Sequence, residues 1–265
     1  MNVSVIITTY NRPGALKRVV QGLLGQTRVP DEIVIADDGS SFETRDLVKQ
    51  LIAQAGSCRM VHVWQKDKGF RAARARNLAI KETTGEYIIS LDGDCIPEIH
   101  FVEDHLKLAK SGCFFQGKRV LVEKEWSETF LFENTKQTLA LILAGMKNKI
   151  SHTHHLLRLP FWPALENTKL SGIKSCNMGF FKEDLLAVNG FNQDFIGWGR
   201  EDSELALRLF NLGLRRRGHP FKAICFHLWH EENDRDRMEI NEGLLKEQIK
   251  SRQIVCKNGI ITQED

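Results

Sequence analysis

Asp92 and Asp94 are two carboxylates with a single glycine between them, and they follow the apolar run Tyr-Ile-Ile-Ser-Leu. Two carboxylates held this close repel each other unless a cation lies between or beside them. Hard divalent cations take oxygen ligands and often join a protein carboxylate to the phosphates of a substrate. The pair therefore indicates a cation site at the end of a buried strand, although a plain Asp-Gly turn has the same residues.

A second pair of candidate metal ligands consists of His227 and His230, at the end of an apolar run over residues 222–228. Their spacing lets both imidazoles approach one metal ion if the strand end curls. Either side chain could instead be packed or hydrogen-bonded without a metal. Three more histidines, at positions 152, 154 and 155, are expected in a solvated loop.

The hexapeptide Gly-Trp-Gly-Arg-Glu-Asp, residues 197–202, combines an aromatic side chain with two carboxylates. Glycines on both sides of Trp198 give a mobile loop that can lay the indole against the apolar face of a sugar. Glu201 and Asp202 begin a predicted helix over 201–212, whose N-terminal dipole favours ionised carboxylates. At least one of them can therefore serve as a base. The alternative is a simple acidic helix start with Trp198 in the core.

Three arginines, Arg71, Arg74 and Arg76, lie in a predicted helix over residues 71–82. Arg71 and Arg74 fall on one face of that helix, where they can pair with a phosphate or with acidic side chains. A solvated basic face is the alternative. The sequence contains neither a P-loop signature nor the Gly-x-Gly-x-x-Gly fingerprint, so the nucleotide-binding folds that depend on them lose their main support.

In the first hundred residues, short apolar runs alternate with segments whose apolar residues recur at helical spacing. The elements predicted from this pattern position the candidate residues. Strands are predicted over residues 3–9, 32–36, 60–64 and 86–91, with a helix after each of the first three. This alternation predicts an α/β fold with a parallel sheet and helices on both faces. Ligands of such sheets bind outside the carboxyl ends of the strands. Three polar clusters lie at those ends and mark the predicted site: residues 8–11, 37–40 and 92–94.

The second half of the chain is less regular. The pattern predicts a helix over 127–146, a loop over 151–168, strands over 172–181 and 222–228, and a last helix over 235–252. No stretch rich in Gly, Ser or Pro separates the halves, which predicts one compact domain with a C-terminal extension.

The composition is that of a folded protein, with 265 residues of which 42% are hydrophobic and 27% charged. The formal net charge of +3 does not imply a nucleic-acid partner. The six cysteines form no CxxC pair, which argues against a zinc ribbon or a disulfide framework. The first residues lack the basic segment of a signal peptide, and no apolar run approaches the ~18–20 residues of a membrane span. A reducing cytoplasm is the expected location.

Taken together, these segments resemble family 2 glycosyltransferases of the GT-A fold. The resemblance lies in Val-Ser-Val-Ile-Ile-Thr-Thr-Tyr-Asn, Asp-Asp-Gly-Ser at 37–40, Gly69 with Ala-Arg-Asn at 75–77, and Asp-Gly-Asp at 92–94. The later Gly-Trp-Gly-Arg-Glu-Asp and His-Leu-Trp-His resemble a C-terminal galactosyltransferase-type module. That module is shared with β-1,4-galactosyltransferases and chondroitin-polymerase-like bacterial enzymes. The resemblance covers residues 1–235.

The resemblance implies a donor site and a metal site. Its nucleotide-sugar contacts would be Thr8, Tyr10 and Asp38 on uracil and ribose, Arg76 near the nucleotide edge, and Asp92 on the ribose or donor sugar. Asp94 would bind Mn²⁺ or Mg²⁺ that bridges the diphosphate of a UDP-sugar. His230 resembles the metal histidine of the family, and His227 matches a second ligand of some members.

The resemblance also implies how transfer takes place. Asp202 would be the catalytic base of a single inverting displacement, Glu201 would hold acceptor hydroxyls, and Trp198 with Gly199 would shape the pocket. Arg200 stands where many relatives have glycine. The implied partners are a UDP-sugar donor and a glycan or lipid-linked acceptor, in lipopolysaccharide or capsule assembly.

For the architecture, the resemblance implies a mostly parallel central sheet flanked by helices. Residues 1–110 would form the nucleotide-sugar-binding half of one domain, residues 111–235 its acceptor-binding and catalytic half, and residues 236–265 a helical extension. Aromatic residues among basic ones over 127–165 suggest peripheral contact with the inner face of the plasma membrane or with a lipid-linked acceptor. The alternative, that these aromatics cover the core, is slightly preferred.

Three other functions compete with this interpretation. A nucleotidyltransferase that makes nucleotide-sugars would usually carry a Gly-rich, basic loop after the first strand, where this chain has Thr-Thr-Tyr-Asn. A zinc hydrolase built on the histidine pair lacks a third ligand at a persuasive spacing. A non-catalytic module for a UDP-sugar or polysaccharide would bind the nucleotide without turnover.

Overall fold

The computed structural model describes residues 1–159, 161–231 and 234–262 of the chain. Its larger sheet begins with four parallel strands, β1 (Val3–Thr9), β2 (Glu32–Asp37), β3 (Arg59–Trp64) and β4 (Tyr87–Asp92), in the order β3-β2-β1-β4. Thr8 of β1 pairs with Ala36 of β2 and with Asp92 of β4. The carboxyl ends of these strands are therefore level, and the three polar clusters meet at one edge.

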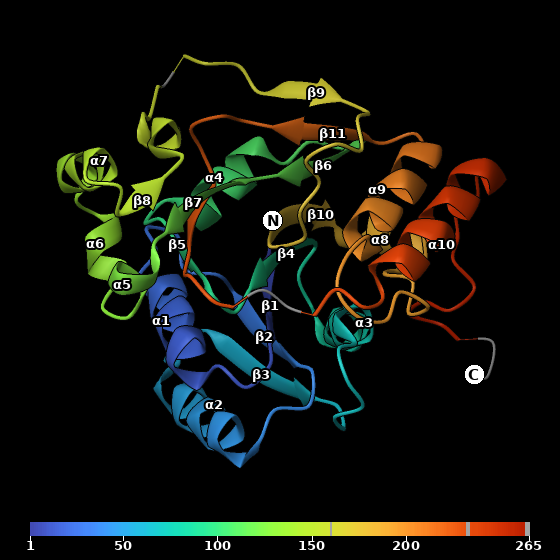
Figure 1. The fold of residues 1–265 in the computed structure, drawn as a ribbon, viewed down its shortest axis with the longest axis horizontal. Coiled ribbons are helices and arrows are strands. Elements are labelled where there is room, and N and C mark those ends of the chain that lie inside the picture. The colour runs from blue at the N-terminus through green and yellow to red at the C-terminus, as the bar shows by residue number, and fades with distance from the viewer. Residues whose placement is uncertain (160, 232–233, 263–265) are drawn as a thin grey trace.

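Helices cover both faces of these strands. Helices α1 (Pro13–Leu24) and α2 (Phe42–Gln54) lie on one face and α3 (Ala72–Glu82) lies on the other (Figure 1). Because successive side chains of a strand point to opposite faces, Val5 and Ile7 pack in the core with α1 and α2, whereas Ile6 packs in the core with α3. Pro13 occupies the first turn of α1, where its missing N–H costs no helical hydrogen bond.

The other strands of the larger sheet come from the second half of the chain. Strand β10 (Asn177–Phe181) pairs antiparallel with β4 and with β6 (Cys113–Gln116). Beyond them, β11 (Arg215–Gly218) is parallel to β6, and β9 (Leu165–Asn167) is antiparallel to β11. The sheet is thus parallel through its N-terminal half and becomes mixed where β10 enters.

A smaller sheet brings distant residues to the Asp-Gly-Asp segment. It has the order β5-β12-β7-β8, with β5 (Cys95–Pro97), β12 (Ile224–His227), β7 (Lys118–Val122) and β8 (Ile150–Ser151). Strand β5 starts directly after Asp94 and pairs antiparallel with β12, so that Cys95 lies opposite His227. The pairing places the first histidine of the predicted pair beside the carboxylates.

The predicted helix over residues 127–146 is wrong, because this stretch is broken into short pieces. The Asn134 side-chain oxygen accepts a hydrogen bond from the Leu131 N–H at 2.8 Å, and this side-chain bond starts a new helix instead of continuing the old one. The remaining helices are α4 (Phe101–Leu108), α5 (Lys124–Ser127), α6 (Phe132–Thr135), α7 (Thr138–Met146), the 3₁₀ helix η1 (Thr153–Leu156), α8 (Lys182–Ala187), α9 (Glu201–Asn211) and α10 (Met238–Ser251).

The strand predicted over residues 172–181 starts only at Asn177. The Gln116 side chain accepts from the N–H of Lys174 and donates to its carbonyl, and these bonds hold residues 172–176 out of the sheet. The strand predicted over 222–228 and the last helix are each present, with slightly shorter bounds.

The C-terminal extension packs against the rest of the chain. Helix α10 contacts α9, and Cys256 and Ile260 are buried near Asn189, whose side-chain amide donates to the Cys256 carbonyl. All six cysteines are free and buried. Within the described residues, no helix has the length and apolar character required to cross a membrane.

Candidate active site

Arg76 joins three of the predicted site residues. This buried side chain of α3 donates to Thr8 Oγ1 at 3.1 Å, to Asp92 Oδ1 at 3.2 Å and to Glu201 Oε1 at 3.2 Å. Burial lowers the pKa of Arg76, but Asp92 and Glu201 outweigh that effect and raise it overall. The guanidinium therefore stays charged and ties the end of β1, the Asp-Gly-Asp segment and the start of α9 into one network.

Glu201 and Asp202 lie in the first turn of α9, as predicted. Glu201 is 8% exposed; burial and the charge of Asp202 raise its pKa to about 7, against the opposing effect of Arg76. Burial also raises the pKa of Asp202, although the N–H and hydroxyl of Ser203 and the N–H of Ser175 donate to its carboxylate. Both carboxylates are thus poised to take up protons more readily than ordinary acidic side chains.

Asp94 lies between the two histidines at the end of β12. Its Oδ1 is 3.7 Å from His227 Nε2, and its Oδ2 is 3.4 Å from His230 Nε2. Burial lowers the pKa of His227, which keeps its imidazole neutral. His230 Nδ1 lies 2.6 Å from the Glu231 carbonyl, which fixes the proton on Nδ1 and leaves Nε2 directed at Asp94. Such an oxygen and nitrogen donor set fits a divalent metal ion.

Two further side chains contact Asp94. Cys95 Sγ lies 3.6 Å from Asp94 Oδ1, and burial raises the pKa of this thiol, so it remains a protonated donor and not a thiolate ligand. Arg12 donates to Asp94 Oδ2 at 2.7 Å and supplies the positive charge beside the carboxylate. Neither Cys95 nor Arg12 was named as a site residue from the sequence. For Arg12 no sequence signal was available, because only the fold brings it to the strand end.

Tyr10, Asp38 and Trp198 line a cavity of about 380 Å³. All three are among the residues expected to contact the donor. Asp38 is fixed by the Arg71 N–H at 2.6 Å and by the Gln65 side-chain amide, and burial raises its pKa. Two of the other lining residues, Gly69 and Gly197, belong to motifs already quoted from the sequence. Sequence reasoning missed the rest, which lie in loops without a periodic signal: Phe70, Asp234, Asp236 and Arg237.

The loop around Trp198 is held by the C-terminal extension. Trp198 is 36% exposed, so the alternative of a core tryptophan does not apply. Asn241 of α10 donates to the Gly199 carbonyl at 2.9 Å, and Arg200 Nε lies 2.6 Å from Glu242 of the same helix. Arg200 has φ +76°, in the region that favours glycine, so this ion pair holds a conformation that the residue rarely adopts.

The remaining predicted candidates have structural partners. The Arg71 side chain donates to the Lys66 carbonyl and that of Arg74 to Gln65, so neither forms a simple solvated basic face. His155 is not fully solvated, because its Nδ1 lies 2.7 Å from the Pro220 carbonyl. His152 and His155 also line a second cavity, which the sequence did not predict.

Comparison with known proteins identifies the family of this chain. Residues 4–178 match the model of glycosyl transferase family 2. The chain belongs to this family. Residues 161–231, which include the Gly-Trp-Gly-Arg-Glu-Asp segment and both metal-candidate histidines, match the N-terminal domain of galactosyltransferase.

Curated relatives of this family 2 chain are longer proteins. It is 29% identical to the hyaluronan synthase of Pasteurella multocida, over 89% of this chain and 26% of the relative. It is 30% identical to the validoxylamine A glucosyltransferase of Streptomyces hygroscopicus subsp. limoneus, over 80% of this chain and 48% of the relative. The chain thus spans about a quarter to a half of the length of these two relatives.

Solved structures share the GT-A fold. A mannosyltransferase from Pyrobaculum calidifontis in complex with GDP-Man and Mn²⁺ aligns with a TM-score of 0.59 and 20% identity, over 87% of this chain and 58% of that one. TarS 1-349 of S. aureus in complex with UDP-GlcNAc aligns with a TM-score of 0.60 and 16% identity, over 88% and 60%. These likenesses establish the architecture expected from the sequence.

Proposed function

We propose that this chain is an inverting, metal-dependent glycosyltransferase that moves a sugar from a UDP-sugar to a glycan or lipid-linked acceptor in cell-surface polysaccharide biosynthesis. The observation that carries this proposal is the Arg76 network. It links the strand ends that lead to the metal-candidate residues with the helix that starts at Glu201 and Asp202. Donor site and base thereby occupy one edge of the sheet.

Asp202 acts as the base in a single in-line displacement. It removes the proton of an acceptor hydroxyl as that oxygen attacks the anomeric carbon and UDP departs from the opposite side. Hydrogen bonds from Ser175 and Ser203 fix the orientation of its carboxylate. Glu201 uses Oε1 for Arg76 and offers its other oxygen to an acceptor hydroxyl.

Asp94, His227 and His230 would hold Mn²⁺ or Mg²⁺. When bound, the ion stabilises negative charge on the departing UDP. Tyr10 and Asp38 support the uracil and ribose from the 380 Å³ cavity, with Thr8 and Asp92 deeper at the strand ends. Trp198 and Gly199 close the side between donor and acceptor.

Transfer is tested by incubating the protein and Mn²⁺ with a panel of UDP-sugars and glycan or lipid-linked acceptors, and by measuring UDP release together with the glycosylated product. We expect product only when donor and acceptor are both present. Nucleotide binding without turnover on any acceptor would favour a non-catalytic module. Formation of a UDP-sugar from UTP and a sugar phosphate would favour a nucleotidyltransferase.

The pH dependence of kcat follows from the carboxylates of α9. A base must be ionised to accept a proton, and burial raises the pKa of Asp202 above its usual 3.8. Activity is therefore retained above the raised pKa and lost as the pH falls through it. We expect the acidic limb of the profile at a higher pH than an ordinary aspartate would give, measured by initial rates in buffers of constant ionic strength. A limb at or below pH 4 would contradict this environment for the base.

Tyr10→Ala is expected to weaken UDP binding roughly 5- to 150-fold, because stacking of a base on an aromatic ring contributes about 1–3 kcal/mol. Tyr10→Phe, which keeps the ring and loses only the hydroxyl that donates to Asp67, should retain most of the affinity. Calorimetry with Mn²⁺ measures both variants. Phe161→Ala, at a side chain that is 96% exposed and does not line the donor cavity, is the control. Equal affinities for wild-type protein and Tyr10→Ala would remove Tyr10 from the donor site.

Helix α7 supports peripheral contact with a membrane at the cytoplasmic face. Phe130 and Phe132 are buried, as the core alternative requires. Leu139 and Met146 of α7 are exposed, and so is Phe161, which lies outside this helix. We expect the protein to sediment with phosphatidylglycerol vesicles at low salt, and Leu139→Glu with Met146→Glu to abolish this. Leu186→Glu, at an exposed leucine of α8, is the control. Sedimentation that the double variant leaves unchanged would exclude α7 as the contact.

A further inference from the structure

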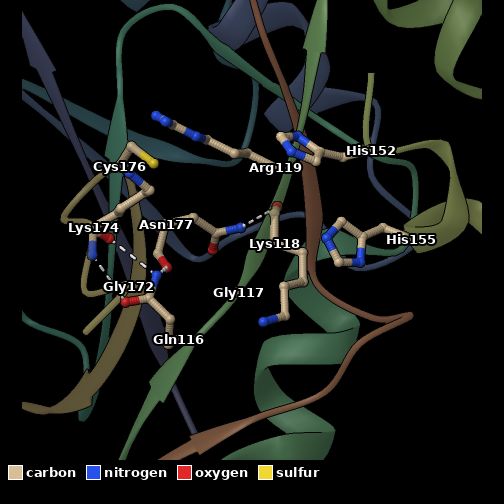
Figure 2. Close-up of a pocket in the computed structure, with 10 residues that line it drawn as sticks. All are labelled: Gln116, Gly117, Lys118, Arg119, His152, His155, Gly172, Lys174, Cys176 and Asn177. Carbon is tan, nitrogen blue, oxygen red and sulfur yellow. Dashed lines mark hydrogen bonds between the residues drawn. The ribbon is translucent and has the colours of Figure 1, made fainter. Parts of the chain in front are cut away.

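A second cavity, of about 310 Å³, is rich in cationic side chains (Figure 2). Its walls come from the end of β6, the start of β7, the segment before β10, and the histidines at η1. None of its lining residues is acidic, and three of them carry a positive charge: Lys118, Arg119 and Lys174. The full lining is Gln116, Gly117, Lys118, Arg119, His152, His155, Gly172, Lys174, Cys176 and Asn177.

These three cations lack the acidic partners that other basic side chains have. In the described part of the chain, none of the three forms an ion pair with a carboxylate, whereas Arg158 pairs with Asp104 and Arg217 pairs with Glu166. Burial and, to a smaller extent, the charge of Arg216 lower the pKa of Lys118, so its charged form is held here at a free-energy cost. An anion in the cavity would offset that cost.

Hydrogen bonds connect the walls of the cavity to one another. The Gln116 amide donates to the carbonyl oxygens of Lys174 and Asn177, both at 3.0 Å. The Asn177 amide donates to the Lys118 carbonyl at 3.0 Å, and a Cβ on Gly117 would lie only 2.3 Å from that amide. Both amides are thus occupied in holding the walls, and the cations remain for a ligand.

His155 adds a neutral acceptor to this charged cavity. Its Nδ1 donates to the Pro220 carbonyl, and burial lowers its pKa to about 4, so that Nε2 carries a lone pair at neutral pH. Such a nitrogen accepts a hydrogen bond from a hydroxyl. A sugar that bears both hydroxyls and a negative charge would match this combination of groups.

The cavity adjoins the proposed base. Ser175, whose N–H donates to Asp202 at 3.2 Å, stands between Lys174 and Cys176, and both of these line the cavity. Arg119 also acts electrostatically on Asp92, whose carboxylate contacts Arg76. A sugar seated in the cavity can therefore present a hydroxyl toward Asp202 from the acceptor side.

We propose that this cavity binds a negatively charged group of the acceptor, a carboxylate or a phosphate on its sugar, through Lys118, Arg119 and Lys174. The proposal rests on the proposed function, because it assigns the cavity to the acceptor of that reaction. The acceptor would accordingly be an acidic glycan or a phosphate-bearing sugar, and neutral glycans would bind weakly.

Binding of small glycosides, measured by calorimetry with no donor present, tests the proposal. The probes are p-nitrophenyl β-glucuronide, glucose 6-phosphate and the neutral p-nitrophenyl β-glucoside. We expect at least one anionic probe to bind about tenfold more tightly than the glucoside, since hydrogen bonds to charged groups are the stronger class. Preference for the glucuronide would identify a carboxylate, and preference for the sugar phosphate would identify a phosphate.

Variants locate the binding. Lys118→Gln and Lys174→Gln should each reduce the preference for the anionic probe several-fold, and the double variant should remove it, whereas Lys169→Gln, at an exposed lysine outside the cavity, should leave it unchanged. UDP affinity in Mn²⁺ should stay the same in all variants, which also shows that they fold. Equal or undetectable binding of charged and neutral probes at 10 mM, or a preference that survives in the double variant, would overturn the proposal.

The proposed function and the proposed anion cavity can be overturned independently of each other. Loss of UDP binding in the wild-type protein, with an intact preference for an anionic probe, would remove the donor site and leave the anion cavity in place. Normal UDP binding without a preference for an anionic probe would remove the anion cavity and leave the donor site in place.

Discussion

Asp202→Asn is expected to reduce kcat for sugar transfer by roughly 10²- to 10⁴-fold, the range associated with loss of a positioned general base. Asparagine has nearly the same shape, and its single side-chain oxygen can still accept the Ser203 N–H, although the bond from the Ser175 N–H to the other oxygen is lost. The start of α9 should therefore remain in place. The amide cannot take the proton of an acceptor hydroxyl. UDP affinity should therefore be unchanged, because Asp202 does not line the donor cavity.

Rates with saturating donor and acceptor, together with a UDP titration, measure this separation. Asp46→Asn is the matched control, since Asp46 is an exposed side chain of α2 that pairs with Lys49 on the surface. Parallel loss of turnover and UDP binding in Asp202→Asn would assign a structural role to Asp202. Full activity in this variant would place the base elsewhere.

Asp94→Ala is expected to weaken metal-dependent UDP binding by at least about 100-fold. Loss of groups that merely support metal ligands typically costs 10- to 100-fold in affinity or activity, so loss of the carboxylate between His227 and His230 should cost at least as much. Two imidazoles would remain, a donor set that no longer suits a hard cation. Titration of Mn²⁺ followed by its EPR signal, with and without UDP, measures the effect.

Arg12→Gln is the informative control for Asp94. Arg12 donates to the same carboxylate oxygen that faces His230, so it competes with a metal ion for Asp94. Removing its charge should leave Mn²⁺ affinity equal or higher, opposite in sign to Asp94→Ala. Weakened metal binding in Arg12→Gln together with normal binding in Asp94→Ala would contradict the assignment of the ligands.

The N-terminal half of the fold follows from local sequence signals. Strands such as β1 and β2 are buried on both faces, so each is an apolar run that ends in a polar cluster, and the runs predict strand ends correctly to within about a residue. Parallel pairing then brings Thr8 level with Asp92 without further information. This is why the site edge could be predicted before any contact was known.

The second half depends on long-range pairing that no local pattern encodes. Strand β10 enters antiparallel beside β4, although 94 positions of the sequence separate Phe181 from its partner Tyr87. Arg76 was recognised as a site residue, yet its partner Glu201 lies 125 residues away. The cationic cavity draws on three separate segments around residues 117, 153 and 174, each unremarkable in sequence.

Arg200 illustrates a departure from the family pattern that the structure explains. The resemblance implies that many relatives have glycine at this position, so an arginine suggests a stiffer loop. Here the residue keeps the positive φ that glycine would adopt, and Glu242 of α10 binds its side chain. The C-terminal extension, left without a role by sequence reasoning, thereby positions the loop that carries Trp198.

Calorimetric titration of UDP in the presence of Mn²⁺, repeated in EDTA and with GDP and dTDP, tests the central claim most directly. We expect binding that depends on the metal and prefers UDP, because the proposed site assigns Asp94 and its histidines to the metal at the diphosphate and Tyr10 and Asp38 to the uridine. Equal binding of all three nucleotides, binding that is the same in EDTA, or no binding of UDP would contradict the proposed donor site.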